Sequence, residues 1–238
     1  MFRFFKYSIF LYLRIKMRYF FWIISFLFLY NQSYSQNSFS IGFKSGYSSS
    51  NIHFYNNFFP SNTNTNPLNS FNYSFVSEIQ TQKNVGLRFE ISHQKKGWKQ
   101  EFLDGQFYHS TINYLNIPIL MNAYVGKSKT KLLFSIGPFF DFLLNHDNEY
   151  SLLDEDANTI LDVDYNSLRD NEFGYGLMAS AGISFDFNKN SFQLLTSYQY
   201  NLDNLIDVNI KSPDIPDISN FNTLSISLVY LLNFKSSK

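Results

Sequence analysis

The sequence predicts an all-β fold, an eight-stranded antiparallel up-and-down transmembrane β-barrel, and three observations support this prediction. From Asn37 onward, eight segments place apolar side chains at every second position, which is the period of a strand with one apolar face. Long and short gaps alternate between the segments; the long gaps are residues 49–70, 96–111, 145–171 and 202–220, and the short gaps are residues 81–84, 126–129 and 188–190. Aromatic residues make up 20% of the chain and charged residues only 16%, against about 25% charged in soluble domains. Barrels that cross a membrane combine such a surface with tight turns at one end and long loops at the other.

The first 35 residues have the pattern of a secretory signal peptide. They carry five basic residues and no acidic one, and the apolar run at residues 19–30 is followed by the small residues Ser33 and Ser35. This run is shorter than the roughly 20 residues of a spanning helix, so a membrane anchor is the weaker alternative. We expect residues 1–35 to be cleaved off before Gln36, leaving residues 36–238 as one barrel domain. Met17 is an alternative start to Met1, because a complete signal follows it.

Charge and cysteine content exclude several classes of function. Without residues 1–35 the chain has 14 basic and 19 acidic residues, a net charge of −5. An acidic chain is a poor nucleic-acid binder, so no nucleic-acid partner is expected. The chain contains no cysteine, which rules out disulfides and thiolate metal sites. No cofactor is expected, and stability must come from packing and a closed hydrogen-bond ladder.

Each expected strand has one apolar face and one face of polar or small residues. In chain order, the apolar faces begin at Phe39, Phe71, Val85, Leu115, Leu132, Tyr175, Phe192 and Leu224 and continue at every second residue. The opposite faces of the first three strands hold Lys44, Glu78, Arg88 and Glu90. A soluble barrel buries its apolar face, whereas charges on the other face indicate a polar lumen and an apolar wall toward lipid. Closure is required, since unpaired backbone groups in hydrocarbon are very unfavourable.

Aromatic residues on the expected outer faces fall into two groups. We call the end with the short gaps the turn end and the end with the long gaps the loop end. The loop-end group is Tyr47, Tyr73, Phe142, Tyr175 and Tyr200, and the turn-end group is Phe39, Phe187, Phe192 and Phe234. Two girdles of this kind anchor a barrel at both membrane interfaces. Pro118 and Pro138 fit less well, because each removes a ladder donor, and we place them at bulges or near strand ends.

Several short motifs resemble those of a known family. Residues 91–98 (ISHQKKGW) resemble its Y-S-Q-K-G strand end, residues 114–120 (YLNIPIL) its Y-L-E-I-P-L-L strand, and residues 137–139 (GPF) its G-P-Y strand. Together with the signal end at residues 33–36, they make the chain similar to the PorT-like outer-membrane β-barrel family of Bacteroidetes over nearly all of residues 39–234. This resemblance implies an eight-stranded outer-membrane barrel without an assigned reaction. Asn116 stands where the family usually has an acid, so no role of that acid is carried over.

The charged residues of the expected lumen have two interpretations. An eight-stranded barrel is just wide enough for side chains to fill it, and charges withdrawn from water persist when they are paired. We therefore expect Lys44, Glu78, Arg88 and Glu90 to pair as a structural plug. The alternative is a narrow, gated ion path through the same residues, whereas a wide porin needs many more strands.

Acidic residues are concentrated in residues 141–172, which hold ten acids against the single base Arg169. Oxygen ligands at this density are suited to calcium, or to divalent ions that bridge to lipopolysaccharide. No glycine-turned ligand spacing accompanies them, so a solvated loop is the favoured interpretation and no metal site is predicted. The Asn- and Thr-rich residues 61–69 are expected to form a polar exposed loop.

Four histidines, His53, His93, His109 and His146, are expected at or beyond the loop ends of the strands. Pairs such as His93 with Ser92 or Ser110, or His146 with Asp147, would resemble the nucleophile–base or acid–histidine pairs of hydrolases. No third group is placed to orient the base, so no catalytic residue is predicted and the chain is not expected to be an enzyme.

The sequence thus predicts an outer-membrane barrel of structural or interaction type. Its expected partners are outer-membrane lipid, lipopolysaccharide and envelope proteins that contact the external loops. The alternatives are a barrel enzyme acting on outer-membrane lipid or peptide, a narrow pore, and a soluble lipocalin-like carrier. A lipocalin would line its cavity with apolar residues, so the polarity of the lumen separates it from the other classes.

Overall fold

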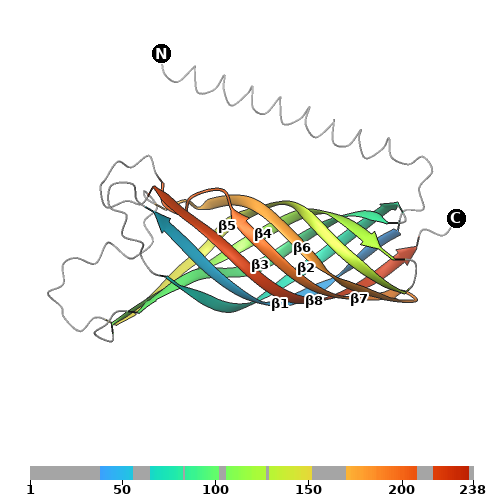
Figure 1. Cartoon of the computed structure of the whole chain (residues 1–238), viewed down its shortest axis with the longest axis horizontal. Helices are drawn as coiled ribbons and strands as arrows, with labels where there is room; N and C mark the ends of the chain where they lie inside the picture. The colour runs from blue at the N-terminus through green and yellow to red at the C-terminus, as the bar shows by residue number, and fades with distance from the viewer. Residues whose placement is uncertain are drawn as a thin grey trace, which may run out of the picture. The chain divides into compact units, whose positions relative to one another are not determined.

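A computed structural model of the chain describes residues 38–55, 65–82, 84–101, 106–126, 129–151, 170–207 and 217–235. Eight strands follow one another in a closed barrel: β1 (Ser38–Tyr55), β2 (Asn66–Gln82), β3 (Val85–Glu101), β4 (Phe107–Val125), β5 (Thr130–Ser151), β6 (Phe173–Phe187), β7 (Asn190–Asn201) and β8 (Ile218–Lys235) (Figure 1). Each strand pairs antiparallel with the next, and β1 pairs with β8 to close the ring. The predicted up-and-down barrel is therefore confirmed. The predicted signal peptide lies outside the described residues.

Several strands extend further toward the loop end than the sequence predicts. β1 reaches Tyr55, β3 reaches Glu101, β5 reaches Ser151 and β8 begins at Ile218. The predicted long gaps at residues 49–70, 96–111, 145–171 and 202–220 were therefore too long, and part of the expected loop at residues 61–69 belongs to β2. The outer ends of these strands carry polar side chains on the face where the membrane segments are apolar, which made them look like loops. About 9–11 residues per strand suffice to cross a membrane, so the 22-residue β5 extends well beyond it.

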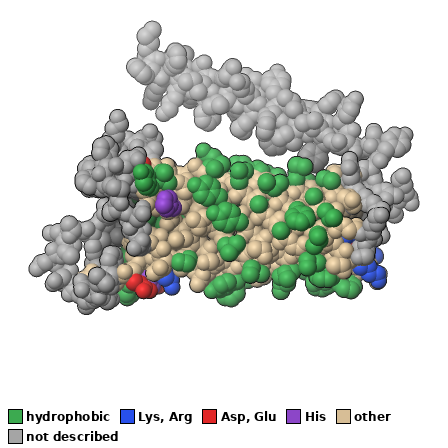
Figure 2. Space-filling model, in the orientation of Figure 1, with side chains coloured by type: hydrophobic (Ala, Val, Ile, Leu, Met, Phe, Trp, Pro, Cys, Tyr) green, Lys and Arg blue, Asp and Glu red, His purple; other side chains and the backbone are tan. Residues whose placement is uncertain are grey.

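The two faces of the barrel wall have the predicted orientation. Phe43 and Ile226 are 68% and 58% exposed on the outside, whereas Glu90 and Ser227 are 0% and 3% exposed in the interior. On the visible face, apolar side chains spread over the wall and charged side chains gather near its ends (Figure 2). The apolar surface therefore faces outward, which is the arrangement that lipid requires.

The two predicted aromatic girdles both lie on the outer surface. All nine of their members are more than 40% exposed. At the loop end the rings of Tyr47 and Phe71 pack edge to face with centroids 5.3 Å apart. At the turn end the centroids of Phe39 and Phe234 lie 6.2 Å apart across β1 and β8.

Within the described ranges, no helix has the length and apolarity needed to cross a membrane.

Pro118 and Pro138 lie within strands, so their predicted placement at bulges or strand ends was wrong. Pro118 pairs with Phe139, and Pro138 pairs with Leu177. The irregularity in the β4–β5 register lies elsewhere, at Asn113 and Tyr114. Each proline withholds a donor from only one neighbouring strand, so the strand pairing persists on the other side and the barrel stays closed.

Candidate functional site

The four charged residues predicted to pair in the lumen do so, in a group that we call the lower ionic cluster. Lys44 forms an ion pair with Glu90, and Arg88 Nη2 lies 3.0 Å from Glu78 Oε2. Arg88 Nη1 is also 3.7 Å from Glu90 Oε1. Two cations thus meet two carboxylates, and the cluster has no net charge. Such mutual pairing makes it tolerable for these side chains to be buried in the barrel.

Neutral groups from β4 and β7 complete the lower ionic cluster. The Arg88 guanidinium donates to Gln193 Oε1 of β7, and the Tyr124 hydroxyl donates to Glu78 Oε1. The arginine therefore connects β2, β3 and β7. Arg88 and Gln193 are far apart in the sequence. They meet because closure of the barrel brings β3 and β7 to face each other across the lumen.

Two apolar layers adjoin the ionic groups of the lumen. Their members are Val76, Tyr124, Leu133, Leu195, Val229 and Leu231 in one layer and Leu120, Phe139 and Met178 in the other. Phe139 is fully buried and packs against Gly176, where an added Cβ would lie 2.6 Å from the ring. The sequence predicted a polar lumen, whereas the structure places apolar clusters beside the ionic ones.

A second group of charges, the upper ionic cluster, lies nearer the loop end and was missed by sequence reasoning. Lys96 Nζ donates to Asp141 Oδ2 at 2.6 Å and to Asn201 Oδ1 at 2.9 Å. Asn116 Nδ2 donates to Asp141 Oδ1 at 2.7 Å. Lys96 was assigned to a gap, and Asp141 was counted with the acidic stretch 141–172, which was interpreted as a solvated loop. The sequence did contain a sign of this cluster. If the alternation of β3 is continued past Ile91, Lys96 falls on the same inward face as Arg88.

Asn116 is matched to the charge of this cluster. Its amide donates to Asp141, whose single negative charge is balanced by Lys96. An acid at position 116 would place a second carboxylate against Asp141 with one cation to serve both. The amide at this position therefore keeps the upper ionic cluster neutral.

Beyond the upper ionic cluster, the polarity of the barrel wall inverts. The inward residues become apolar and form a cluster, which we call the cap: Ile52, Trp98, Tyr108, Ile112, Tyr114, Leu205 and Phe221, with Phe54, Leu143 and Ile206 packed against it. The outward positions of the same strand ends become polar; they include Asn51, His53, Lys95, Lys99, Thr111, Asp147 and Glu149. An apolar interior with a polar exterior is the arrangement of a soluble barrel. This part of the wall is therefore built to stand in water.

Residues 201–207, which we call the strap, join the cap from the end of β7. The Leu202 amide donates to Tyr175 O, and the Leu205 amide donates to Ser219 O, at 2.9 and 2.8 Å. The Ile206 amide donates to Ser219 Oγ at 3.0 Å. Leu205 is buried in the cap. The strap thus links β6 with β8 at the loop end and supplies apolar side chains to the cap.

Asp203 of the strap is held in a partly buried position beyond the end of β7. Its Oδ1 accepts hydrogen bonds from the Tyr175 amide at 2.8 Å and from Asn201 Nδ2 at 3.2 Å. Burial raises the pKa of the Asp203 carboxyl above its ordinary value, these hydrogen bonds oppose the rise, and the charge of Asp141 adds to it. Ionised Asp203 therefore lowers the stability of the strap relative to the protonated form.

The strap is expected to open more readily at neutral than at acidic pH. A carboxyl whose pKa is higher in the folded state binds more protons there, so stability is greatest below the ordinary pKa and is lost as pH rises through the folded value. Amide hydrogen exchange at Leu202 and Leu205, corrected for intrinsic rates, would measure this. Asp203→Asn keeps an acceptor oxygen and removes the titration, so its strap protection should be independent of pH. Equal pH dependence in both proteins would contradict the assignment to Asp203.

The histidines do not form the pairs that the sequence suggested. His93 is exposed on the outside of β3, whereas Ser92 faces inward and donates to Ser74 Oγ at 2.7 Å. Ser110 Oγ instead lies 2.8 Å from His146 Nε2. Ser110 is fully buried, whereas His146 is half-buried. His53 and His109 lie on the outer face of the strand ends.

The acidic stretch 141–172 is divided among different environments. Asp141 is buried in the upper ionic cluster, whereas Asp147 and Glu149 lie on the outside of β5. Acids 154–164 fall outside the described residues. In the part of the chain that the structure describes, no three His, Asp or Glu side chains are grouped as a metal site would require.

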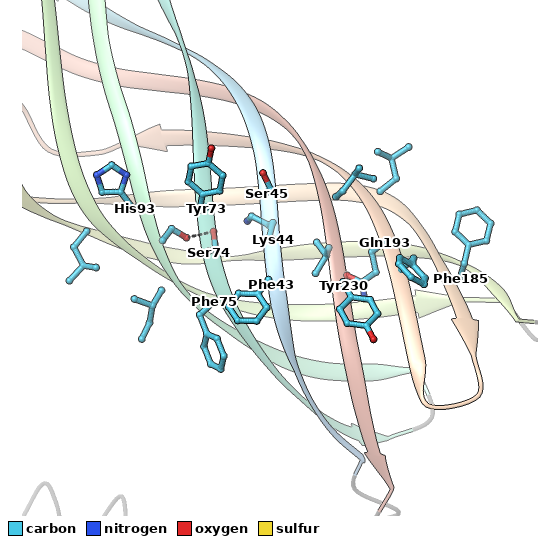
Figure 3. A pocket seen from close by; sticks show the side chains of 17 residues that line it. Phe43, Lys44, Ser45, Tyr73, Ser74, Phe75, His93, Phe185, Gln193 and Tyr230 are labelled. Atoms are coloured by element: carbon cyan, nitrogen blue, oxygen red, sulfur yellow. Dashed lines mark hydrogen bonds between the residues drawn. The ribbon is translucent and has the colours of Figure 1, made fainter.

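An apolar hollow of about 930 Å³ lies along the wall. Its lining includes the outward rings of Phe43, Phe75 and Tyr230 together with Lys44 and Gln193 from the lumen side (Figure 3). Acyl chains cover an outer wall of this kind in a membrane. The hollow is therefore part of the lipid-facing surface, and no ligand is assigned to it.

Comparison with known proteins agrees with this geometry. A family model described as "Outer membrane protein beta-barrel domain" matches residues 31–207. The chain belongs to this family. No curated protein matches the chain in sequence. As an outer membrane protein beta-barrel domain, the protein is located in the outer membrane.

Several solved structures of outer-membrane proteins are similar to this barrel at low identity. The N-terminal barrel domain of Pseudomonas aeruginosa OprF is 11% identical, with 84% of this chain and 100% of that chain covered and a TM-score of 0.41. AlkL, solved in lipid bilayers, is 11% identical over 87% and 94% of the two chains, with a TM-score of 0.47. Neisserial surface protein A is 12% identical over 82% and 97%, with a TM-score of 0.40.

Proposed function

We propose that this outer-membrane barrel is a non-catalytic structural or interaction protein that presents its loop end to the cell exterior. The observation that carries the proposal is the inversion of polarity beyond the upper ionic cluster. It turns the ends of β1, β3, β4, β5 and β8 into a water-facing extension of the barrel. A protein that only sealed or spanned the membrane would not need such an extension.

The interior of the barrel supports a lumen closed by side chains rather than a pore. Arg88, Lys96, Glu90 and Asp141 are at most 1% exposed, and Phe139 is fully buried between the two ionic clusters. Each described lumen cation pairs with an acid. Ions moving through the lumen would have to separate these pairs and displace the apolar layers, which is unfavourable in a medium of low dielectric constant.

The burial of Ser110 favours a structural role of the serine–histidine pair over a catalytic one. A hydrolase nucleophile must reach its substrate and be activated by an oriented base. Ser110 is fully buried beneath the polar outer wall, where lipid and peptide substrates have no access. The proposal therefore assigns Ser110 and His146 to packing at the loop end.

The finer family assignment is also part of the proposal. The motif residues 91–98, 114–120 and 137–139 lie in β3, β4 and β5 and supply Lys96, Asn116 and the Phe139 layer. Their structural use supports membership of a PorT-like group of Bacteroidetes barrels, with a cleaved signal peptide at residues 1–35. The expected partners are outer-membrane lipid and lipopolysaccharide at the wall and envelope proteins at the loop end.

The proposed closed lumen is tested by conductance in planar bilayers. The purified barrel should give no steady current of defined size, because the ionic and apolar layers leave no path for ions. Arg88→Ala, which removes the largest buried lumen cation, should introduce measurable current if the layers form the seal. A steady unitary current from the unmodified protein would overturn the closed lumen and favour the narrow pore.

The proposed interaction role is tested by placing photo-crosslinking side chains at outward positions of the loop end. Crosslinkers at His53 and Lys99 should capture the same envelope protein reproducibly in intact outer membranes. Matched crosslinkers at Phe43 and Ile226 on the lipid-facing wall should not capture it. Capture of no protein at the loop-end positions would remove the support for an interaction role.

A further inference from the structure

Charge is separated along the axis of this barrel. Among the described residues, four lysines and one aspartate lie at the turn end of the barrel: Lys129, Lys131, Lys189, Lys235 and Asp186. Among the described residues, the loop end holds the acids Glu101, Asp141, Asp147, Glu149, Asp170, Glu172, Asp203, Asp207 and Asp217 against the bases Lys95, Lys96 and Lys99. Blue side chains are visible at the turn end, on the right of Figure 2. The turn end is therefore strongly basic, although the whole chain is not.

The described turns hold their lysines in place through backbone hydrogen bonds. The Lys129 carbonyl accepts from the Asp186 amide at 2.8 Å, and the Lys189 carbonyl accepts from the Asn233 amide at 2.7 Å. Both lysine side chains are exposed. Neither forms an ion pair with a described residue, in contrast to the cations of the lumen.

The one acid at this end is already engaged. Asp186 Oδ2 lies 2.8 Å from Lys131 Nζ, and its Oδ1 accepts from Ser191 Oγ at 2.6 Å. It is therefore not available to Lys129 or Lys189. Their charges need an anionic partner from outside the barrel or remain solvated.

The aromatic girdle places these lysines at the level of lipid headgroups. Phe187 and Phe192 flank the turn that carries Lys189, with ring centroids 6.4 Å apart. The Tyr230 hydroxyl donates to Asn190 Oδ1 at 3.0 Å in the same turn. Aromatic rings of barrels lie at the boundary between acyl chains and headgroups, so a lysine just beyond them reaches the headgroup phosphates.

We propose that the exposed turn-end lysines Lys129 and Lys189 form a collar that binds the phosphates of anionic phospholipid headgroups in the adjacent leaflet. The acidic loop end offers no comparable attraction to an anionic surface, so the collar also favours one orientation of the barrel. A lysine near an anionic membrane surface contributes about 1 kcal/mol, which corresponds to about fivefold in affinity. The collar concerns the opposite end from the proposed interaction surface and does not depend on it.

Native mass spectrometry of the detergent-purified full chain, titrated with phosphatidylglycerol or phosphatidylcholine, tests the collar. The unmodified protein should bind phosphatidylglycerol at least tenfold more tightly than phosphatidylcholine. Lys129→Gln with Lys189→Gln should weaken phosphatidylglycerol binding by about 25-fold and leave phosphatidylcholine binding unchanged. High salt should suppress the preference of the unmodified protein, since screening weakens exposed charges.

The matched control removes the same charge at the other end of the barrel. Lys95→Gln with Lys99→Gln should keep the phosphatidylglycerol preference, and heat-modifiable migration on gels would show that both double variants are folded. The proposal is overturned if the unmodified protein shows no lipid preference, if the Lys129/Lys189 variant retains it, or if the Lys95/Lys99 variant loses it equally.

Discussion

Replacing Arg88 with methionine is expected to destabilise the barrel by about 3–5 kcal/mol, the usual cost of removing one partner from a buried charge group. Arg88 is fully buried and serves Glu78, Glu90 and Gln193. Its loss leaves two carboxylates with only Lys44 to balance them. The free energy of unfolding in phospholipid vesicles, measured by urea titration with gel migration as the readout, would report the change.

A second substitution separates charge balance from lost packing. Glu78→Gln added to Arg88→Met restores neutrality, because Lys44 and Glu90 still pair. The double variant should therefore recover most of the stability lost in the single variant. If the two substitutions instead add their costs, the lower ionic cluster is not held together by charge balance.

Replacing Trp98 with alanine is expected to destabilise the loop end by about 3–5 kcal/mol, as for other buried aromatic truncations. Trp98 is 7% exposed. Its ring contacts Phe54 and Phe221 with centroid distances of 5.3 and 6.1 Å. Truncation therefore leaves a cavity at the centre of the cap. Urea unfolding should show the loss, and hydrogen exchange should show it concentrated in the strap and the ends of β3 and β4.

Fluorescence of Trp98 tests the cap independently of stability. The chain has two tryptophans, Trp22 and Trp98; Trp22 lies in the proposed signal peptide, so Trp98 is the single tryptophan of the mature barrel. Its emission should be poorly quenched by brominated lipid, because the ring faces the interior of the cap. As a control, Tyr73→Trp combined with Trp98→Phe places the fluorophore on the lipid-facing girdle, where quenching should be strong. Strong lipid quenching of Trp98 itself would contradict its inward orientation.

Alternation along the strands was sufficient to predict the barrel and the facing of most side chains. Phe43 and Lys44 are neighbours in sequence, and a pleated strand directs them to opposite sides. Hence the sequence alone indicated that Phe43 meets lipid and that Lys44 pairs in the lumen. The lower ionic cluster could be predicted because few acids and bases shared the inward face of the first three strands.

The cap and the upper ionic cluster could not be predicted in the same way. Beyond Ile91 in β3, outward positions turn polar at His93 and Lys95, while Trp98 inside is apolar. The prediction identified strands by apolar residues at their outward positions. That pattern stops at this point, so residues 96–111 were interpreted as a loop. Asp141 was grouped by its charge with the acidic stretch 141–172, although it pairs with Lys96 in the lumen.

The sequence by itself determined the strand number, the antiparallel order and which side chains face lipid, because each follows from local period and gap length. Only the tertiary structure decided which inward residues meet, since Arg88 with Gln193 and Lys96 with Asn201 are brought together by closure of the ring. It also decided where the membrane segment ends and the water-facing wall begins. That boundary lies where inward apolar side chains from several strands and from the strap pack together. No single segment of the sequence shows which residues of the other segments it will contact.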